Sequence, residues 1–208
     1  MKVLDAPASR HFTFRQLVEC GETFYRRAVP TAEAPQQAAS WEMLAGRALH
    51  ILDPVVDELG PVQLTYCFAP ASLTREIQRR KRTEKIHALI DPRVDQHAAC
   101  ELKENGEPIC ERPGAAVDFR VPGKSMVEVV RWLVESMPKL PIDKLYYYGE
   151  ERPVHVSWSP SPEGRRNAHR DLRVQARALH WAKAEQGAAA RAARWAGSKE
   201  MSVTPGLR

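Results

Sequence analysis

The stretch Ala115-Ala116-Val117-Asp118-Phe119-Arg120-Val121 alternates apolar and polar side chains and predicts a half-buried β-strand. Val117, Phe119 and Val121 fall on one face at a period of two residues. Asp118 and Arg120 fall on the opposite face. A strand of this kind packs its apolar face on a core and presents a carboxylate on its other face.

A second stretch, Val154-His155-Val156-Ser157-Trp158, repeats this arrangement. Its apolar residues again share one face, with His155 and Ser157 opposite them. If both strands belong to one sheet, Asp118 and His155 meet above it. The pattern leaves open a plainer alternative, in which the solvent-facing side of a sheet merely carries polar residues.

A third residue of a metal-binding type, His97, lies in the segment Asp95-Gln96-His97. Two neutral imidazoles and one carboxylate can hold a catalytic zinc ion that keeps one coordination position open. A water in that position has its pKa lowered to about 7, which makes hydroxide available near neutral pH. Residues of these types occur by chance in most chains of this length, so the prediction of a Zn²⁺ site at His97, Asp118 and His155 depends on the strand context of the last two.

The 208 residues, 43% of them hydrophobic, suffice for one core and an appendage. The sequence contains no run of about 18 apolar residues, which indicates no membrane span. The first residues lack the apolar region of a signal peptide, so we expect a cytoplasmic protein, or one released by lysis if it is of phage type. The four cysteines form no CxxC pair and are expected to be reduced thiols, with a link between Cys100 and Cys110 left open.

The positive charge is concentrated at the end of the chain. Residues 161–208 hold 10 of the 31 Lys and Arg and 4 of the 26 Asp and Glu, so the first 160 residues are close to neutral. This change divides the chain into a domain of residues 1–160 and a basic extension of residues 161–208, helical or partly disordered. The extension is expected to be a solvated helix or an arm for an anionic partner. Its arginines at helical spacing are Arg166, Arg170, Arg173 and Arg177.

The remaining pattern predicts helices that precede and interrupt a small, mainly antiparallel sheet, and hence an α+β fold. Capping boxes begin helices at Thr13 and at Ser125. An amphipathic helix over 41–59 is expected to kink at Pro54, and Asn105-Gly106 predicts a hairpin turn. The other expected elements are strands over 62–66, 144–148 and 153–158 and a short helix over 70–78 that runs into Arg79-Arg80-Lys81-Arg82.

From about His11 to Pro160 the order of these motifs resembles the M15 peptidases, which have the Hedgehog/DD-peptidase fold. The zinc D-alanyl-D-alanine carboxypeptidases and phage-type endolysins are the branch in question. The resemblance implies that His97, Asp118 and His155 are zinc ligands. The motifs that carry it are His11-Phe12-Thr13-Phe14-Arg15-Gln16-Leu17, Leu52-Asp53-Pro54-Val55, Leu64-Thr65-Tyr66, Gln96-His97, Gly114-Ala115-Ala116-Val117-Asp118, Asp143-Lys144-Leu145 and His155-Val156-Ser157.

Three positions depart from the family pattern. The family has a short spacing between its first His and its Asp, whereas 20 residues separate His97 from Asp118 here. A loop of this length adds little closure entropy, so it is compatible with the site. A substrate-binding arginine of the family is replaced by Cys67. The family's general-base glutamate aligns with Tyr148, so Glu150 or Glu151 in the following turn becomes the candidate proton carrier, with Glu151 nearer to the ligand strand.

These features predict two alternative functions. The first is a zinc-dependent amide or peptide hydrolase that uses a metal-bound water and acts on peptidoglycan-like peptides through Tyr66, Arg93 and Tyr148. The second is a binding module that keeps the fold without peptidase activity and grips an anionic partner such as nucleic acid. Its contacts would be the basic extension and Arg79, Arg80, Lys81 and Arg82. A third interpretation treats the histidines as ordinary buried polar groups.

Overall fold

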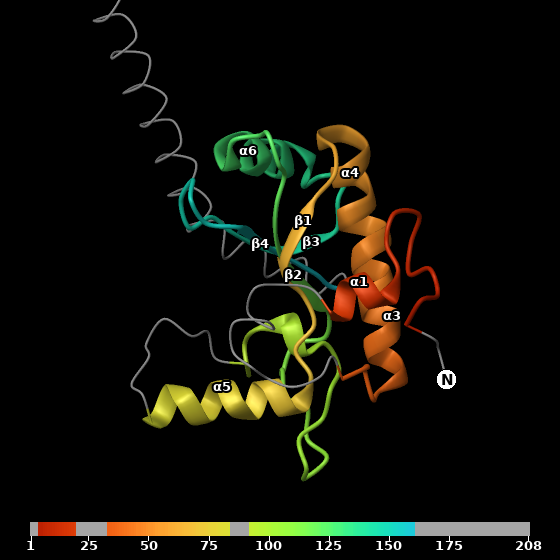
Figure 1. The fold of residues 1–208 in the computed structure, drawn as a ribbon, viewed down its shortest axis with the longest axis vertical. Helices are drawn as coiled ribbons and strands as arrows, with labels where there is room; N and C mark the ends of the chain where they lie inside the picture. The colour runs from red at the N-terminus through yellow and green to blue at the C-terminus, as the bar shows by residue number, and fades with distance from the viewer. Residues whose placement is uncertain (1–3, 20–32, 84–91, 161–208) are drawn as a thin grey trace, which may run out of the picture.

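The computed structural model describes residues 4–19, 33–83 and 92–160 (Figure 1). These residues form an α+β fold, as predicted, built on one four-stranded antiparallel sheet. The order of the strands is β1-β2-β4-β3, so β2 and β4 are the central pair. The strands are β1 (Gln63–Tyr66), β2 (Ala115–Arg120), β3 (Ile142–Tyr146) and β4 (Val154–Trp158).

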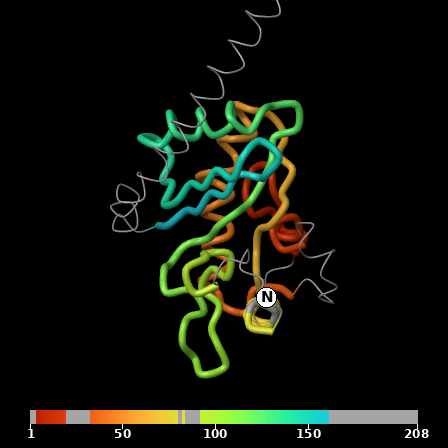
Figure 2. The backbone as a smooth tube through the Cα atoms, turned by 90° about the vertical axis from the view of Figure 1, so that its left-hand side faces the viewer, coloured from red at the N-terminus to blue at the C-terminus, as the bar shows by residue number. Residues whose placement is uncertain are grey.

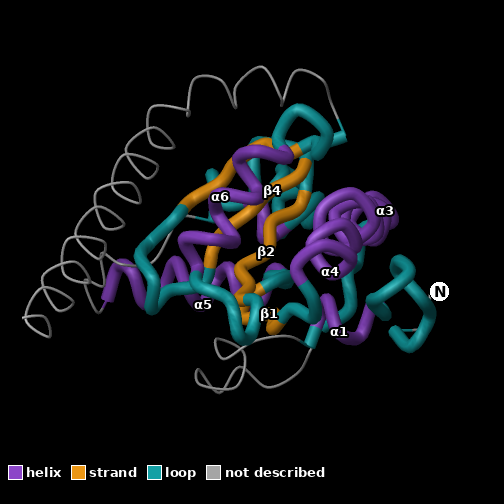
Figure 3. Tube along the Cα trace, turned by 90° about the horizontal axis from the view of Figure 1, so that it is seen from above, coloured by secondary structure: helices purple, strands orange, loops and turns teal. Residues whose placement is uncertain are grey.

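Helices pack beside this sheet. Helices α3, η1 and α4 follow one another without a break and lie along one side of the strands in Figures 1 and 3. None of the helices in the described residues is long and apolar enough to cross a membrane. The helices are α1 (Phe14–Val18), α3 (Ala38–Arg47), the π-helix η1 (Ala48–Leu52), α4 (Asp53–Leu59), α5 (Ala71–Thr83), the 3-10 helix η2 (Gln96–Ala98) and α6 (Met126–Ser136).

Both predicted capping boxes are confirmed. The Thr13 hydroxyl accepts a hydrogen bond from the backbone N–H of Gln16, whose side chain accepts one from the backbone N–H of Thr13. Ser125 and Glu128 make the same reciprocal pair at the start of α6. Each box depends only on residues three apart, which is why the sequence alone locates these two helix starts.

The predicted long helix is present, and its irregularity lies just before Pro54. The five residues of η1 widen into a π-helix, in which the backbone N–H of Asp53 bonds to the carbonyl of Ala48. Proline lacks the N–H that would continue the regular ladder, so the preceding turn shifts its hydrogen bonds by one residue. The sequence predicts a kink at Pro54, and the structure places a π-helical turn, one of the known causes of kinks, directly before it.

The apolar faces of the strands meet the helices in one core, as the alternation predicts. Val117, Phe119, Val154 and Val156 are fully buried. They belong to one cluster with residues of α1, α3, η1, α4 and α6. Arg47 of α3, also fully buried, donates a hydrogen bond to the carbonyl of Ala116 and so ties the helix to β2. The polar face of the central strands is therefore left on the other side of the sheet.

Three elements have a boundary more than one residue from the prediction. Helix α3 begins at Ala38, three residues before the predicted start. Helix α5 continues to Thr83, so the basic run lies within a helix rather than after one. Strand β3 spans Ile142–Tyr146, two residues earlier than predicted, with an irregularity between Ile142 and Lys144 that shifts its register against β4. Such a bulge interrupts the regular pairing of side chains between two strands.

The Asn105-Gly106 turn is confirmed. Gly106 has a φ of +82°, and Lys103 and Glu107 are joined across the turn by a backbone hydrogen bond. Figure 2 shows this loop as an extension beyond the sheet, at the same end of the molecule as α5. Cys100 and Cys110, at its two ends, are free thiols and form no link. The predicted basic extension, residues 161–208, lies outside the described residues.

The buried carboxylate of Glu101 joins this loop to the start of α3. It accepts hydrogen bonds of 3.1 Å from the backbone N–H groups of both Gln36 and Gln37, while its own residue is only 2% exposed. Gln37 is the N-cap of α3 and makes no cap with its own side chain, so the two bonds from Glu101 hold the segment that leads into the helix.

We expect the change Glu101→Ala to lower the free energy of unfolding by about 1–3 kcal/mol, because two backbone donors lose their acceptor. The matched control is Glu104→Ala in the same loop, whose carboxylate is 83% exposed and pairs with Arg75; its cost should stay below about 1 kcal/mol. Urea unfolding of the two variants measures the difference. Equal losses would mean that the bonds from Glu101 to the segment before α3 do not stabilise the fold.

Candidate metal site

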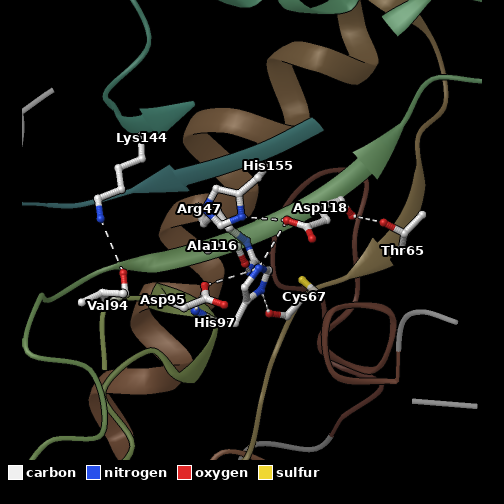
Figure 4. A network of polar contacts seen from close by, with 10 residues as sticks. All are labelled: Arg47, Thr65, Cys67, Val94, Asp95, His97, Ala116, Asp118, Lys144 and His155. Atoms are coloured by element: carbon white, nitrogen blue, oxygen red, sulfur yellow. Dashed lines mark hydrogen bonds and ion pairs between the residues drawn. The ribbon is translucent and has the colours of Figure 1, made fainter. Parts of the chain in front are cut away.

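The register of the sheet sets four side chains in a row on its polar face. Asp118 of β2 lies directly opposite His155 of β4. Tyr66 of β1 is the partner of Asp118 on one side, and Tyr146 of β3 is the partner of His155 on the other. The predicted meeting of Asp118 and His155 above the sheet is confirmed (Figure 4).

His97 reaches this row from η2, a single turn of helix held on several sides. The Gln96 side chain donates to the carbonyl of Pro113, and the backbone N–H of Ala69 donates to the carbonyl of His97. The ammonium group of Lys144 on β3 lies 3.5 Å from the carbonyl of Val94, just before η2. These contacts fix a short segment that has little secondary structure of its own.

Gly114 allows η2 to approach the sheet. It has a φ of +137°, in the region that favours glycine, and it immediately precedes β2. A Cβ atom here would lie 2.6 Å from Nε2 of Gln96 and would also collide with the carbonyl of Trp158. Any larger residue would therefore displace the Gln96 side chain, which ties η2 to the chain just before β2.

The His97 ring has a defined proton position. Its Nδ1 lies 2.6 Å from the backbone carbonyl of Cys67. A carbonyl can only accept a hydrogen bond, so Nδ1 carries the proton. This leaves Nε2 as the atom that points to the cluster; it is buried and has no hydrogen-bond partner among the described residues.

The ligand-type atoms are close together. Nε2 of His97 lies 3.3 Å from Oδ1 of Asp118, and Nδ1 of His155 lies 2.7 Å from the same oxygen. Ligand atoms at about 2.0–2.1 Å from a tetrahedral zinc ion are about 3.3 Å apart. An imidazole whose other nitrogen donates to a carbonyl is also the usual state of a metal-binding histidine. The donor types and the His97–Asp118 spacing therefore fit a metal ion, whereas the 2.7 Å between Asp118 and His155 is a hydrogen-bond distance.

Asp95 belongs to the same cluster, and the sequence-based ligand set omitted it. One ligand atom from each of Asp95, His97 and His155 lies within 4.8 Å of the others, and this group of described residues does not include Asp118. Oδ1 of Asp95 accepts a hydrogen bond from the backbone N–H of His97 as the N-cap of η2, and lies 3.6 Å from Nε2 of the His97 ring. Its position two residues before His97, where an N-cap bends the chain back, was the available signal.

The charges of the cluster shift its pKa values in opposite directions. Burial alone would lower the pKa of His97, but the carboxylates of Asp95 and Asp118 outweigh it and raise that pKa to about 9. Burial alone would raise the pKa of Asp118, but His97 and His155 hold it well below its usual range. The metal-free cluster is thus an ion pair network, and a metal ion would replace its proton.

Tyrosine side chains flank the cluster, including both tyrosines expected to contact substrate. The Tyr66 ring packs on His97 with a centroid distance of 4.0 Å, and Tyr146 packs on His155 at 5.3 Å. Tyr148 lies next to Tyr146 and is 46% exposed. Its partial burial raises the pKa of its hydroxyl, and the carboxylates of Asp118 and Asp95 raise it further. That hydroxyl is a proton donor at neutral pH.

The expected proton carriers make other contacts. The carboxylate of Glu150 accepts hydrogen bonds of 2.6 and 3.2 Å from the backbone N–H groups of Met126 and Val127, so it caps the start of α6. Glu151 is exposed, and its backbone carbonyl accepts a hydrogen bond from Arg120. The structure describes no contact between either glutamate and the cluster.

Arg93, the third residue expected to contact substrate, is exposed in the turn before η2. Its backbone carbonyl accepts a hydrogen bond of 3.2 Å from the backbone N–H of Glu111. This bond holds the turn against the end of the loop that carries Asn105-Gly106. Arg93 thus lies two residues before Asp95 in the chain, on the solvent side of the segment that leads to His97.

The basic residues expected to bind an anionic partner belong to α5 and to the extension. Arg79 is bound to Glu76 by two hydrogen bonds of 2.7 and 2.8 Å, which neutralise its charge. Arg82 is exposed on the same helix. The side chains of Arg80 and Lys81, and all of Arg166, Arg170, Arg173 and Arg177, lie outside the described residues.

In the metal-free protein, we expect stability to depend on pH through His97. Its folded pKa of about 9 exceeds its ordinary value of 6.5. The stabilisation is therefore fully present below about pH 6.5 and is lost as the pH rises through 9, by on the order of 3 kcal/mol. Urea unfolding of chelator-treated protein at about pH 6.5 and about pH 9.5 measures this loss.

The change His97→Gln should flatten this pH dependence, whereas His11→Gln, which alters a histidine outside the cluster, should preserve it. An equal slope in native protein and in His97→Gln would show that His97 does not bind its proton more tightly in the folded state.

Comparison with other proteins yields no similarity from which a function can be taken. No protein family, no curated protein and no solved structure matches the chain. A function for the chain therefore has to be inferred from the geometry of the cluster and the chemistry of its side chains.

Proposed function

We propose that the protein is a metal-dependent hydrolase of amide bonds, with zinc held by His97, Asp118 and His155. The observation that carries the proposal is the convergence of ligand-type atoms: the buried Nε2 of His97 lies 3.3 Å from Oδ1 of Asp118, and Nδ1 of His155 lies 2.7 Å from the same oxygen. In the metal-free protein these carboxylate contacts compensate a proton on His97, and a metal ion would take the place of that proton. The resemblance to M15 peptidases supports the same residues and suggests peptidoglycan-like peptides as substrates.

When bound, zinc would polarise a substrate carbonyl and make water acidic enough to react near neutral pH. The protein holds the proposed ligand side chains in fixed orientations. The Cys67 carbonyl and the Tyr66 ring hold the His97 imidazole in one orientation, and the pairing of β2 with β4 holds Asp118 beside His155. Preorganised ligands of this kind need no rearrangement when substrate arrives.

Tyr148 is the residue we assign to the developing negative charge on the substrate. Its raised pKa keeps the hydroxyl protonated, it is partly exposed, and it is close enough to Asp118 and Asp95 to respond to their charge. A phenol can donate a hydrogen bond to an oxyanion. Glu151 stays the candidate proton carrier, since the carboxylate of Glu150 is engaged by α6.

Peptide cleavage tests the proposal. Zinc-loaded protein is incubated with a panel of peptidoglycan stem peptides and ordinary peptides, and products are identified by mass spectrometry. We expect cleavage that falls by at least about 100-fold in Asp118→Ala and after chelation, because the metal provides several kcal/mol of transition-state stabilisation.

The control is Glu104→Gln, which removes an exposed carboxylate that pairs with Arg75 and should cleave like the native protein. Cleavage by Asp118→Ala at the native rate, or no cleavage of any peptide by zinc-loaded native protein, would contradict the proposal.

A further inference from the structure

We infer that Asp143 is a positioning residue, which fixes the place of His97 in the cluster by holding the segment before β2 against β3. It acts through Arg112, Pro113 and Gln96 in turn. The inference deepens the proposed function, because it names what keeps one of the proposed ligands in position. It rests on that function for its metal-binding test, whereas its structural test is made on the metal-free protein.

Asp143 lies at the irregularity in β3. Ile142 and Lys144 pair with consecutive residues of β4, so Asp143 between them is one extra residue. An extra residue of this kind can re-aim a side chain next to a functional site. The Asp143 side chain is 1% exposed, and a buried carboxylate is costly unless it is paired and hydrogen-bonded. The bulge therefore requires an internal partner for Asp143.

Arg112 is this partner. Its Nη2 lies 2.6 Å from Oδ1 and 2.9 Å from Oδ2 of Asp143. Hydrogen bonds between charged groups are roughly twice as strong as those between neutral ones. Burial raises the pKa of Asp143, while the charge of Arg112 and a hydrogen bond from the Gln96 side chain act against that rise. The ion pair therefore holds the end of the loop before β2 against β3.

The residue after Arg112 connects this ion pair to η2. The carbonyl of Pro113 accepts a hydrogen bond of 3.0 Å from Nε2 of Gln96. Gln96 is 1% exposed and directly precedes His97. If Arg112 moves, the Pro113 carbonyl moves with it, and the buried Gln96 side chain loses its acceptor. Groups of a functional site must be held within about 0.5 Å of their working geometry, so a small shift of η2 is enough to misplace His97.

The variant Asp143→Asn removes the charge from the pair and keeps the shape of the side chain. Nδ1 of His97 donates to the carbonyl of Cys67 at 2.6 Å, and a proton in so short a bond gives a downfield NMR signal, identified by its absence in His97→Gln. We expect this signal to shift or disappear in metal-free Asp143→Asn, because η2 is no longer held. Zinc affinity, measured by competition with a chelating dye, should fall by about 10-fold, the lower end of the loss typical of residues that orient metal ligands.

The matched control is Asp53→Asn. Asp53 is also a fully buried carboxylate beside an arginine, with Arg10 3.6 Å away, but it belongs to α4. This variant should keep the native His97 signal and the native zinc affinity, even where urea unfolding shows that it is less stable than the native protein.

A second variant, Arg112→Gln, breaks the same ion pair from the side of Arg112, which is 28% exposed. It should reproduce the effects of Asp143→Asn and replaces that variant if the latter does not fold. An unchanged His97 signal in either folded variant, or an equal change in Asp53→Asn, would overturn the inference. In a native protein that binds zinc, unchanged zinc affinity would overturn it as well. A native protein that binds no zinc would contradict the proposed function, while the NMR comparison would still decide the role of Asp143.

Discussion

The antiparallel pairing of β2 with β4 is the constraint on which the candidate site depends. It places Asp118 directly opposite His155 and turns Val117 and Val156 into the core on the other face. A shift of one residue in this register would exchange the two faces, so the core and the site are specified together. Burial of the two valines stabilises the strand pairing. The same pairing positions Asp118 and His155 on the opposite face.

The position of His97 is fixed by loops rather than by the sheet. His97 stands on one turn of 3-10 helix, and its position depends on the carbonyl of Cys67, on the Asp95 cap and on the close approach that Gly114 permits. The chain leaves β1 at Tyr66, so the Cys67 carbonyl is available to the His97 ring instead of to a neighbouring strand. Two backbone features therefore determine which nitrogen of His97 faces the cluster. They are the Cys67 carbonyl just after β1 and the glycine just before β2.

What the sequence predicted well was local. Alternation over 115–121 and 154–158 identified the two central strands and the faces of Asp118 and His155, and the boxes at Thr13 and Ser125 located two helix starts. What it could not predict depends on residues far apart in the chain. The carboxylate of Glu150, a candidate proton carrier in the sequence, instead caps α6. The two residues in this contact are 24 positions apart, so no local sequence pattern predicts it. The place of Asp95 in the cluster required the fold of η2 against the sheet, although its N-cap role was within reach of the sequence.

Metal content tests the central claim most directly. Protein purified without chelator, with and without added zinc, is analysed by elemental mass spectrometry beside the Asp118→Ala variant. The account predicts about one zinc ion per native chain and little or none in the variant, because the variant loses the carboxylate that lies between the two histidines. A native protein that binds no metal even when zinc is offered would contradict it, and the cluster would then be a buried ion pair network on the polar face of the sheet.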